Sequence, residues 1–209
     1  MKKMISIVIC MITIATSFGL ISCDIAESIN NSVVYPESYS ITYEITSADG
    51  VITTVTKTVD ANGNVYINNA NEEKLYIKEN NTYYLYKKDE NGIFTTLGYI
   101  KYTKEAVDKA TADITKYSEE SKNQFVPTAK LDGESTVAGR RCNIYKLGVG
   151  GDNNNAYYYY HIDAETGICL ELEVSMTALG SSVEYDGETF ICTEFITDNI
   201  DDLSILISK

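Results

Sequence analysis

Residues 39–59 read YSITYEITSADGVITTVTKTV, and this stretch decides the fold class. From Tyr39 to Ile45, large apolar side chains alternate with polar ones, which is the period of a β-strand that buries one face. Ala48-Asp49-Gly50 is a turn signal, and a second alternating run follows it at Val51 to Val59. The two runs therefore predict an antiparallel β-hairpin.

The same pattern continues along most of the chain, with turns rich in Asn, Asp and Gly between short strands. Before residue 101 the predicted strands are Val65 to Asn68, Lys74 to Lys78, Thr82 to Lys87 and Ile93 to Ile100. After residue 127 they are Glu134 to Ala138, Cys142 to Leu147, Ala156 to Ile162 and Ile168 to Val174, with a Gly/Asn loop at Gly148 to Asn155. A last run, from about Val183 to Ile196, is either one bulged strand or folds back at Asp186-Gly187. This spacing predicts an antiparallel meander.

One helix is predicted between the two sets of strands, from about Thr103 to Lys122. Thr103 is a suitable N-cap, and acidic residues follow it near the positive end of the helix dipole. The apolar positions recur at spacings of four and three and are Ala106, Ala110, Ile114 and Tyr117. Because this stripe is narrow and mostly made of small residues, it favours a helix lying over the edge or mouth of a sheet.

The N-terminus has the layout of a secretory signal. Two lysines precede an almost unbroken apolar run from Ile5 to Leu20. The run ends in Leu20-Ile21-Ser22-Cys23, which resembles the lipobox of bacterial lipoprotein precursors. An uncleaved transmembrane anchor is disfavoured because the apolar stretch is short for a membrane span.

The lipobox resemblance implies an exported protein that lipid anchors to a bacterial membrane, at the cell surface or on the periplasmic side. Residues 1–22 would be removed as the signal peptide, and Cys23 would become the lipidated first residue. Two or three acyl chains on one cysteine anchor far more firmly than one. Polar residues from 23 to 37 predict a tether, and 38–209 are left as one domain of a size that can bury a proper core.

Composition and charge restrict the partners. Tyr occurs 17 times and Trp never, and the many Thr, Tyr and Ile residues favour pleated, half-buried surfaces. The net charge is −13, and loss of the two signal-peptide lysines makes it −13 − 2 = −15. Such a surface repels phosphate backbones and anionic headgroups, so a nucleic-acid partner is excluded.

The second half of the chain carries a family resemblance. The segments "GESTVAGRRCNIYKL" (133–147), "YYYYHIDAETGICLELEV" (157–174) and "ETFICTEFIT" (188–197) resemble the LolA/LolB-like family of envelope lipoproteins and carriers. The resemblance implies an α+β, mainly β fold: a strongly curved antiparallel sheet, or incomplete β-barrel, with one main helix covering its concave face. It further implies a groove for acyl chains. The residues expected to line it are Ile168, Leu170, Leu172 and Val174 of one strand and Ala110, Ile114 and Tyr117 of the helix.

Tyrosine clusters are a second feature of the strands. Tyr157 to Tyr160, together with Tyr83, Tyr84 and Tyr86, could form aromatic platforms for sugars or acyl chains. Alternation sends Tyr157 and Tyr159 to one face and the other two residues to the opposite face. Ordinary strand packing is therefore the favoured explanation.

Catalytic and metal-binding motifs are weak. His161, Asp163 and Glu165 are spaced by two and could bind a metal ion or act as acid and base, but a turn explains the Asp and the following Gly. No GxSxG, HExxH or phosphate-binding glycine loop occurs. We expect no enzyme activity, no cofactor and no metal site.

Three cysteines remain besides the two in the N-terminal segment: Cys142, Cys169 and Cys192. If the last two strands turn near Gly180-Ser181, then 169 + 192 = 361 centres the hairpin there and predicts a Cys169–Cys192 disulfide. A turn at Asp186-Gly187 would instead separate the pair.

Together these features predict a membrane-anchored lipoprotein that binds a lipid or another hydrophobic ligand in a half-barrel groove. Its partners would be membrane lipid through Cys23, the hydrophobic ligand and an envelope protein. The alternative is a non-catalytic structural or protein-interaction module whose concavity is filled by side chains. A cavity of several hundred cubic ångströms would favour the ligand-binding function.

Overall fold

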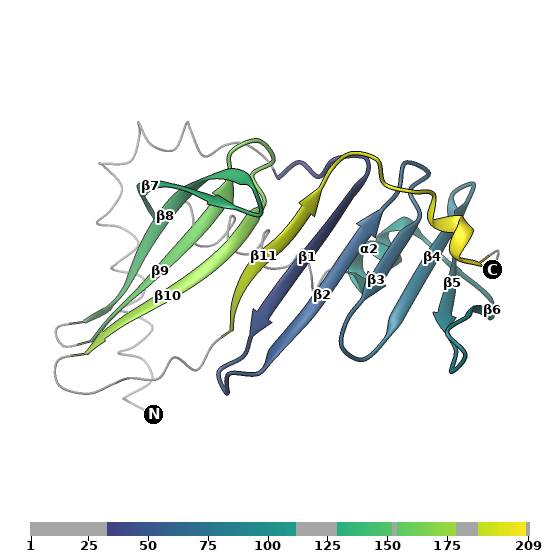
Figure 1. Cartoon of the computed structure of the whole chain (residues 1–209), viewed down its shortest axis with the longest axis horizontal. Helices are drawn as coiled ribbons and strands as arrows, with labels where there is room; N and C mark the ends of the chain where they lie inside the picture. Colours follow the sequence, from purple (N-terminus) through teal and green to yellow (C-terminus); the bar gives the residue numbers. More distant parts are fainter. Residues whose placement is uncertain (1–32, 112–128, 152–153, 179–187, 208–209) are drawn as a thin grey trace, which may run out of the picture. The chain divides into compact units, whose positions relative to one another are not determined.

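Eleven strands form one antiparallel sheet in the computed structural model, which describes residues 33–111, 129–151, 154–178 and 188–207 (Figure 1). The first six strands are β1 (Tyr39–Thr46), β2 (Ile52–Val59), β3 (Val65–Asn68), β4 (Glu73–Glu79), β5 (Thr82–Lys88) and β6 (Phe94–Tyr102). The last five are β7 (Lys130–Val137), β8 (Arg140–Gly151), β9 (Asn154–Asp163), β10 (Cys169–Ala178) and β11 (Thr189–Ile196). A helix, α2 (Lys104–Ala110), and a C-terminal 3-10 helix, η3 (Leu203–Ile207), complete the described elements.

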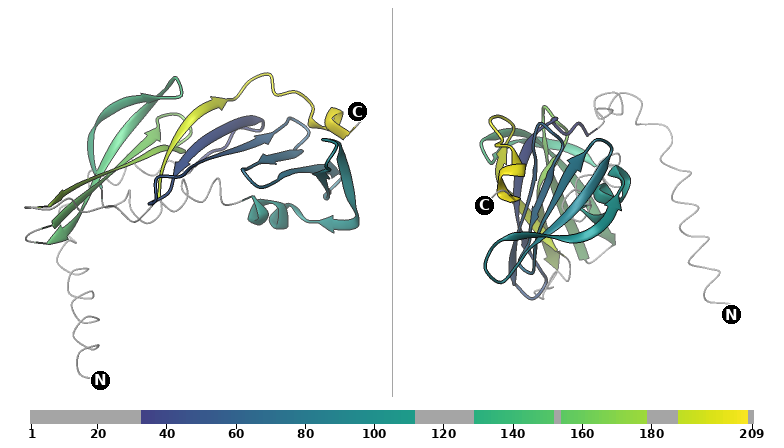
Figure 2. Two further views of the ribbon diagram at one scale, coloured as in Figure 1. Left: turned by 60° about the horizontal axis from the view of Figure 1, so that its bottom comes forward. Right: turned by 90° about the vertical axis from the view of Figure 1, so that its right-hand side faces the viewer.

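The sheet consists of two meanders joined by the first and the last strand. Its order is β6-β5-β4-β3-β2-β1-β11-β10-β9-β8-β7, so β1 and β11 are neighbours at the centre. Their ladder runs from Ser40 paired with Ile196 to Thr46 paired with Thr189, with a bulge after Thr42. Because β6 and β7 stay at opposite edges, the sheet is open and curved and does not close into a barrel (Figure 2). The predicted fold class is thereby confirmed.

Alternation along the strands creates two faces, which we call the helix face and the far face. On the helix face, Tyr39, Ile41 and Tyr43 of β1 are almost completely buried. Helix α2 covers this face over the N-terminal meander, where the Lys57 ammonium of β2 donates a 3.1 Å hydrogen bond to the Thr111 hydroxyl. Thr103 caps the helix as predicted, by accepting a hydrogen bond from the Ala106 amide.

The buried side of α2 differs from the predicted stripe. Ala106 and Ala110 are exposed, whereas Val107 is 1% exposed and Thr111 is 3% exposed. Val107 buries more apolar area than an alanine does, so the helix is turned by one residue relative to the expected register. Ile114 and Tyr117 lie outside the described residues.

The far face of the same meander is covered by η3. Leu75, Ile77 and Phe94 form a buried cluster with Leu203, and Tyr66, Tyr86, Leu206 and Ile207 pack around it. Strand β4 is therefore buried on both sides, since Tyr76 between Leu75 and Ile77 points to the helix face. The sequence pattern did not predict this C-terminal cover.

Asp60 attaches η3 to the sheet. Its carboxylate is 1% exposed and accepts hydrogen bonds from the Asn62 and Asn64 amides, from the Asn64 side chain and from the Leu203 amide, all at 2.8 to 2.9 Å. The Asp60–Asn64 turn predicted from sequence is thus also the docking point of the C-terminus. Gly63 permits it, with φ at +79°.

Three further predictions concern the N-terminal segment, the loop at 148–155 and membrane-spanning helices. The predicted signal peptide and Cys23 lie outside the described residues, while the end of the predicted tether contacts the domain: the Val34 amide donates to the Thr166 carbonyl at 2.9 Å. In place of the predicted loop at 148–155, β8 and β9 continue through its two ends, and Gly148 leaves room for the Tyr157 ring. Across the described ranges, no helix combines the length and the apolar character needed to span a membrane.

Replacement of Asp60 by alanine should test the docking of η3. Three buried or half-buried amides would lose their acceptor, so we expect the free energy of unfolding in urea to fall by about 3 kcal/mol. Hydrogen exchange at the Leu203 amide should also accelerate. Asp49→Ala, in the exposed turn between β1 and β2, is the matched control and should have a much smaller effect. Equal losses in the two variants would contradict the assigned role of Asp60.

Candidate functional site

A cavity lies between α2 and the helix face of the N-terminal meander. Its volume is about 820 Å³. We call it the groove. Its apolar lining comes from Tyr35, Pro36, Tyr39, Val59, Val65 and Tyr83, and its charged lining from Lys57, Lys78, Lys104, Lys109, Glu37, Glu105 and Asp108. Both the chain before β1 and the first turns of α2 therefore contribute walls.

The floor of the groove is buried and apolar. Tyr39 and Tyr83 are each 4% exposed, and Val65 is 7% exposed. The Tyr35 ring packs on Tyr39 with 5.4 Å between ring centroids. Burial raises the pKa of Tyr39 and of Tyr83, so both phenols stay neutral in solution. The strand period places these side chains on one face.

Lysine side chains surround the floor of the groove. The groove holds four lysines against three acids, whereas the whole chain has a net charge of −13. Lys104 forms an ion pair with Asp108, with 2.6 Å between Nζ and Oδ2, and this hydrogen bond raises the pKa of Lys104. Lys57 is 7% exposed and lies under the C-terminal end of α2. An anionic group would find positive charge beside an apolar surface here.

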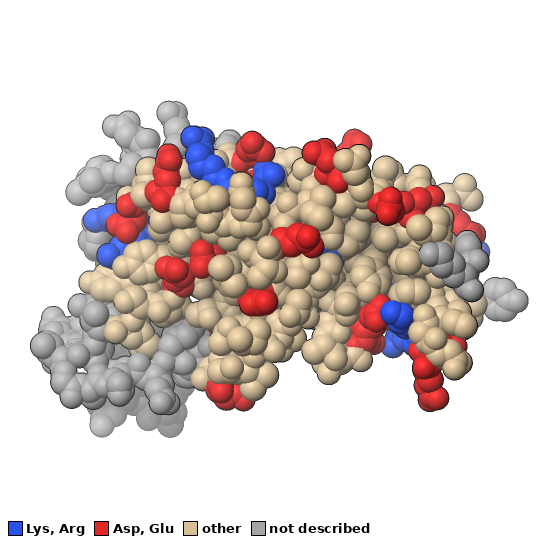
Figure 3. All heavy atoms as spheres, in the orientation of Figure 1, with Lys and Arg blue, Asp and Glu red and all other residues tan. Residues whose placement is uncertain are grey.

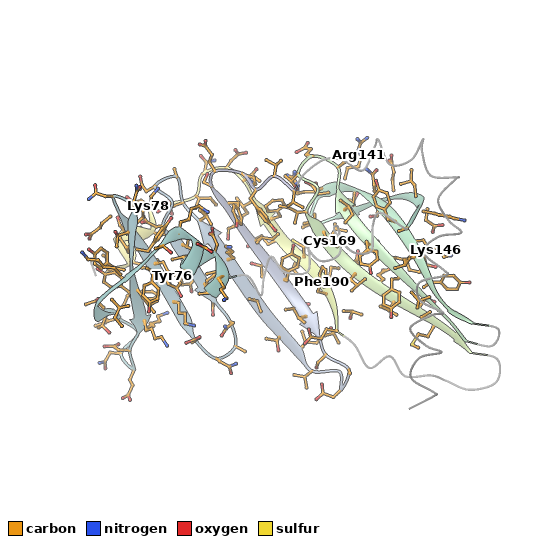
Figure 4. All side chains as sticks on the ribbon, turned by 180° about the vertical axis from the view of Figure 1, so that it is seen from behind. Tyr76, Lys78, Arg141, Lys146, Cys169 and Phe190 are labelled. Carbon is orange, nitrogen blue, oxygen red and sulfur yellow. The ribbon has the colours of Figure 1, made fainter. Side chains whose placement is uncertain are left out.

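The predicted groove residues between Ile168 and Val174 do not line this cavity. Ile168 and Leu170 are completely buried. Leu172 and Val174 line a different cavity of about 420 Å³, together with Phe190. The reason is topological: α2 lies over the N-terminal meander, and β10 belongs to the C-terminal one. Figure 4 shows Cys169 and Phe190 well away from α2.

The smaller cavity lies where β10 meets β11, a junction that we call the β10–β11 seam. Strands β10 and β11 pair at only two positions among the described residues, Glu171 with Ile191 and Leu172 with Phe190. Beyond Leu172 the cavity lies between the two strands. Its walls include Glu44, Glu173 and Ser175.

The tyrosine cluster of β9 is explained by packing. Lys146 of the neighbouring strand β8 places its ammonium 4.4 Å from the Tyr157 ring centroid and 5.2 Å from that of Tyr159. Tyr160, on the opposite face, is 3% exposed. The alternation is as predicted, and the cation–π contacts account for the half-buried pair Tyr157 and Tyr159.

The three residues considered for metal binding or acid–base chemistry do not converge. Asp163 is 2% exposed and accepts two 3.0 Å hydrogen bonds from Arg140, one from Nε and one from Nη2. The Thr166 amide also donates to it at 2.9 Å. Glu165 is exposed and pairs with Arg140, at 2.8 Å between Oε2 and Nη2. His161 lies elsewhere, against β10, so the Asp163 turn is structural as expected.

The structure shows no disulfide between Cys169 and Cys192, so their pairing stays a prediction. Cys142, Cys169 and Cys192 are all buried. The observed pairing of Glu171 with Ile191 gives 171 + 191 = 362 rather than 361, which offsets the two cysteines by one position. Burial raises the pKa of Cys142 to about 11 and that of Cys192 to about 12. Both thiols are therefore protonated and unreactive at neutral pH.

Comparisons with known proteins give structural likenesses alone. No protein-family model and no curated protein matches the sequence. The chain is similar to a solved structure described as "Crystal structure of MucB in complex with MucA(peri)", with a TM-score of 0.37 and 18% identity over 87% of this chain and 56% of that chain. It is also similar to "The complex structure of Pseudomonas aeruginosa MucA/MucB", with a TM-score of 0.39 and 16% identity over 87% and 57% of the two chains. The chain thus spans little more than half the length of either.

Val107→Ala should test the observed register of α2. Loss of two buried methyl groups should lower the free energy of unfolding by about 1.5 kcal/mol. Ala106→Ser, on the exposed side, should change it by less than about 0.5 kcal/mol. Urea unfolding of both variants measures the difference. The predicted stripe would require the opposite order.

The Asp163 turn should make stability depend on pH below about 4. Burial alone would raise the pKa of Asp163, but the bonds from Arg140 and Thr166 outweigh it and lower the pKa. Since the folded pKa lies below the unfolded value of about 3.9, this contribution is present above that pH and is lost as pH falls through the folded pKa.

Asp163→Asn should remove this dependence and leave Arg140 without its buried partner. We expect a loss of about 3 kcal/mol at pH 7, and a smaller difference from the parent protein as pH falls. Glu165→Gln, which alters the exposed partner of the same arginine, should have little effect. A difference that stays constant down to pH 2 in urea unfolding would refute the assignment.

Proposed function

We propose that this chain is a membrane-anchored, LolA-like bacterial lipoprotein that binds an amphipathic lipid in the groove between α2 and the sheet. The observation that carries the proposal is the groove itself. Its volume of about 820 Å³ lies within the range of small-molecule sites, whereas an interaction module would have a filled concavity.

The lining indicates the ligand class. Tyr39, Val65 and Tyr83 offer an apolar floor that favours burial of an acyl chain. The surrounding lysines favour a negatively charged headgroup, such as a phosphate or a carboxylate. We therefore infer that the ligand combines a hydrocarbon chain with an anionic head.

The proposed lipid anchor restricts the biological roles that this protein could have. The lipobox at Leu20 to Cys23 supports lipidation of Cys23, and a doubly or triply acylated protein does not leave its membrane readily. A soluble shuttle is therefore disfavoured. We propose a fixed receiver or holder of lipid at the membrane surface of the envelope.

A protein-interaction module is the second candidate, and the far face is the observation that favours it. There, Glu44, Glu171 and Glu173 surround the partly exposed Ile191, and Figure 3 shows acidic side chains spread over this side of the molecule. An envelope protein with a basic surface would fit such a face. Its binding would leave the groove empty.

Filling the groove should abolish lipid binding. In Val59→Trp, the indole would occupy space beside Val65, so lipid recovered with the purified Cys23→Ser protein should fall at least tenfold, measured by native mass spectrometry. Val149→Trp is the matched control, since Val149 is 52% exposed on β8 and does not line the groove. If the unaltered protein carries no lipid and takes up no apolar fluorescent probe, the proposal fails.

The headgroup is tested by the double charge reversal Lys78→Glu with Lys104→Glu. This change turns the groove from a net charge of +1 to −3, by 4 − 3 for the present lining and 2 − 5 for the variant. Binding of a fatty acid should weaken at least tenfold, and binding of the uncharged alcohol of equal chain length should change little. Equal losses would contradict the role of charge.

A further inference from the structure

A second cluster of polar side chains lies on the far face of the C-terminal meander. His161 of β9 pairs directly with Glu171 of β10, and Tyr159 pairs with Glu173. Directly paired residues point to the same side of a sheet, and diagonal neighbours are close enough to interact. The register therefore brings one imidazole and two carboxylates together, away from the groove.

His161 is buried and is held at one nitrogen only. Its side chain is 8% exposed. Nδ1 lies 2.9 Å from the Ser135 hydroxyl and 3.1 Å from Oε2 of Glu171. Nε2 is buried and has no hydrogen-bond partner among the described residues. Its nearest anionic atom is Oε2 of Glu173, at 3.8 Å.

This arrangement leaves one imidazole nitrogen available to a cation. When Nδ1 carries the proton and donates it to the Ser135 hydroxyl, Nε2 keeps a lone pair. The nearest anionic atom to that lone pair is Oε2 of Glu173, and a cation between the two would replace an unfavourable contact between two acceptors.

We propose that His161, Glu171 and Glu173 bind a Zn²⁺ ion, with Nε2 of His161 and one carboxylate oxygen of each glutamate as ligands. One ligand atom from each residue lies within 4.8 Å of the other two. Metal–ligand bonds of about 2.0 to 2.2 Å place two tetrahedral ligands about 3.4 Å apart, close to the observed 3.8 Å gap. A small rotation of the half-exposed Glu173 side chain closes the difference.

The ligand set favours zinc over Mg²⁺, Ca²⁺ and Cu⁺. Imidazole disfavours Mg²⁺ and Ca²⁺, and carboxylates disfavour soft Cu⁺, whereas Zn²⁺ accepts both ligand types. Ser135 would act beside the metal, by holding the ring of His161 in orientation.

The site is accessible. The cavity of about 420 Å³ beside the β10–β11 seam is lined by Glu171 and Glu173 and provides a route for the ion. Three protein ligands leave a coordination position open toward this cavity. Water, or a carboxylate of a bound partner, could occupy it.

Equilibrium dialysis of the purified Cys23→Ser protein against Zn²⁺, followed by elemental analysis, tests the site. We expect one Zn²⁺ per chain, with affinity at least tenfold weaker in Glu173→Gln and uptake lost in His161→Gln. Glu173 is 59% exposed at its side chain, so its variant should fold even if the histidine variant does not. Glu194→Gln, an exposed glutamate of β11 outside the cluster, is the matched control and should bind normally.

Substitution with Co²⁺ distinguishes this site from the three cysteines. Visible absorption without a sulfur-to-metal charge-transfer band is expected for nitrogen and oxygen ligands. A strong charge-transfer band, no stoichiometric uptake, or uptake that Glu173→Gln leaves unchanged would each overturn the proposal. Lipid binding in the groove is measured separately, so failure of one site leaves the other tested on its own.

Discussion

The pairing of β1 with β11 is the constraint on which the rest of the structure depends. These strands are the first and the last of the sheet in sequence, and Thr193 donates a side-chain hydrogen bond to the Thr42 carbonyl across 151 residues. Tyr43 adds a 2.9 Å bond to the Cys169 carbonyl and an edge-on contact with the Phe190 ring. Without the β1–β11 pairing the chain would form two separate meanders. Closing so long a loop is slow and entropically costly, so local hairpins are expected to form first.

Two buried aspartates stabilise the sheet: Asp60 lies in the N-terminal meander and Asp163 in the C-terminal one. Asp60 satisfies amides of its own turn and of the C-terminal 3-10 helix, and Asp163 binds Arg140 and Thr166 at the far end of β9. Each carboxylate has several donors within hydrogen-bonding distance, as a buried charge requires. His161 is different because one of its buried nitrogens lacks such a partner. That contrast separates residues that build the fold from residues that remain available to a ligand.

Local patterns predicted local structure well. The β1–β2 hairpin, the strand succession and the Thr103 cap follow from alternation and turn chemistry, which act within about ten residues. The buried side of α2 was missed because Val107 outweighs a regular alanine stripe, and only tertiary contact reveals that. Whether Cys169 can pair with Cys192 depends on one residue of register, which a bulge at Leu170 and the short β10–β11 ladder set together. The His161 cluster was missed because its glutamates lie on the next strand, ten and twelve residues along the chain.

The hydrogen bond between the Val34 amide and the Thr166 carbonyl has a consequence for geometry at the membrane. It fixes the point at which the chain joins the domain, and the groove residues Tyr35, Pro36 and Glu37 follow at once. Ten peptide units connect Cys23 to Val33, and a fully extended chain of that length spans at most about 35 Å. If Cys23 is lipidated as proposed, this length limits how far the domain can lie from the membrane that holds the anchor. Such a short connection would suit exchange of ligand with that same membrane.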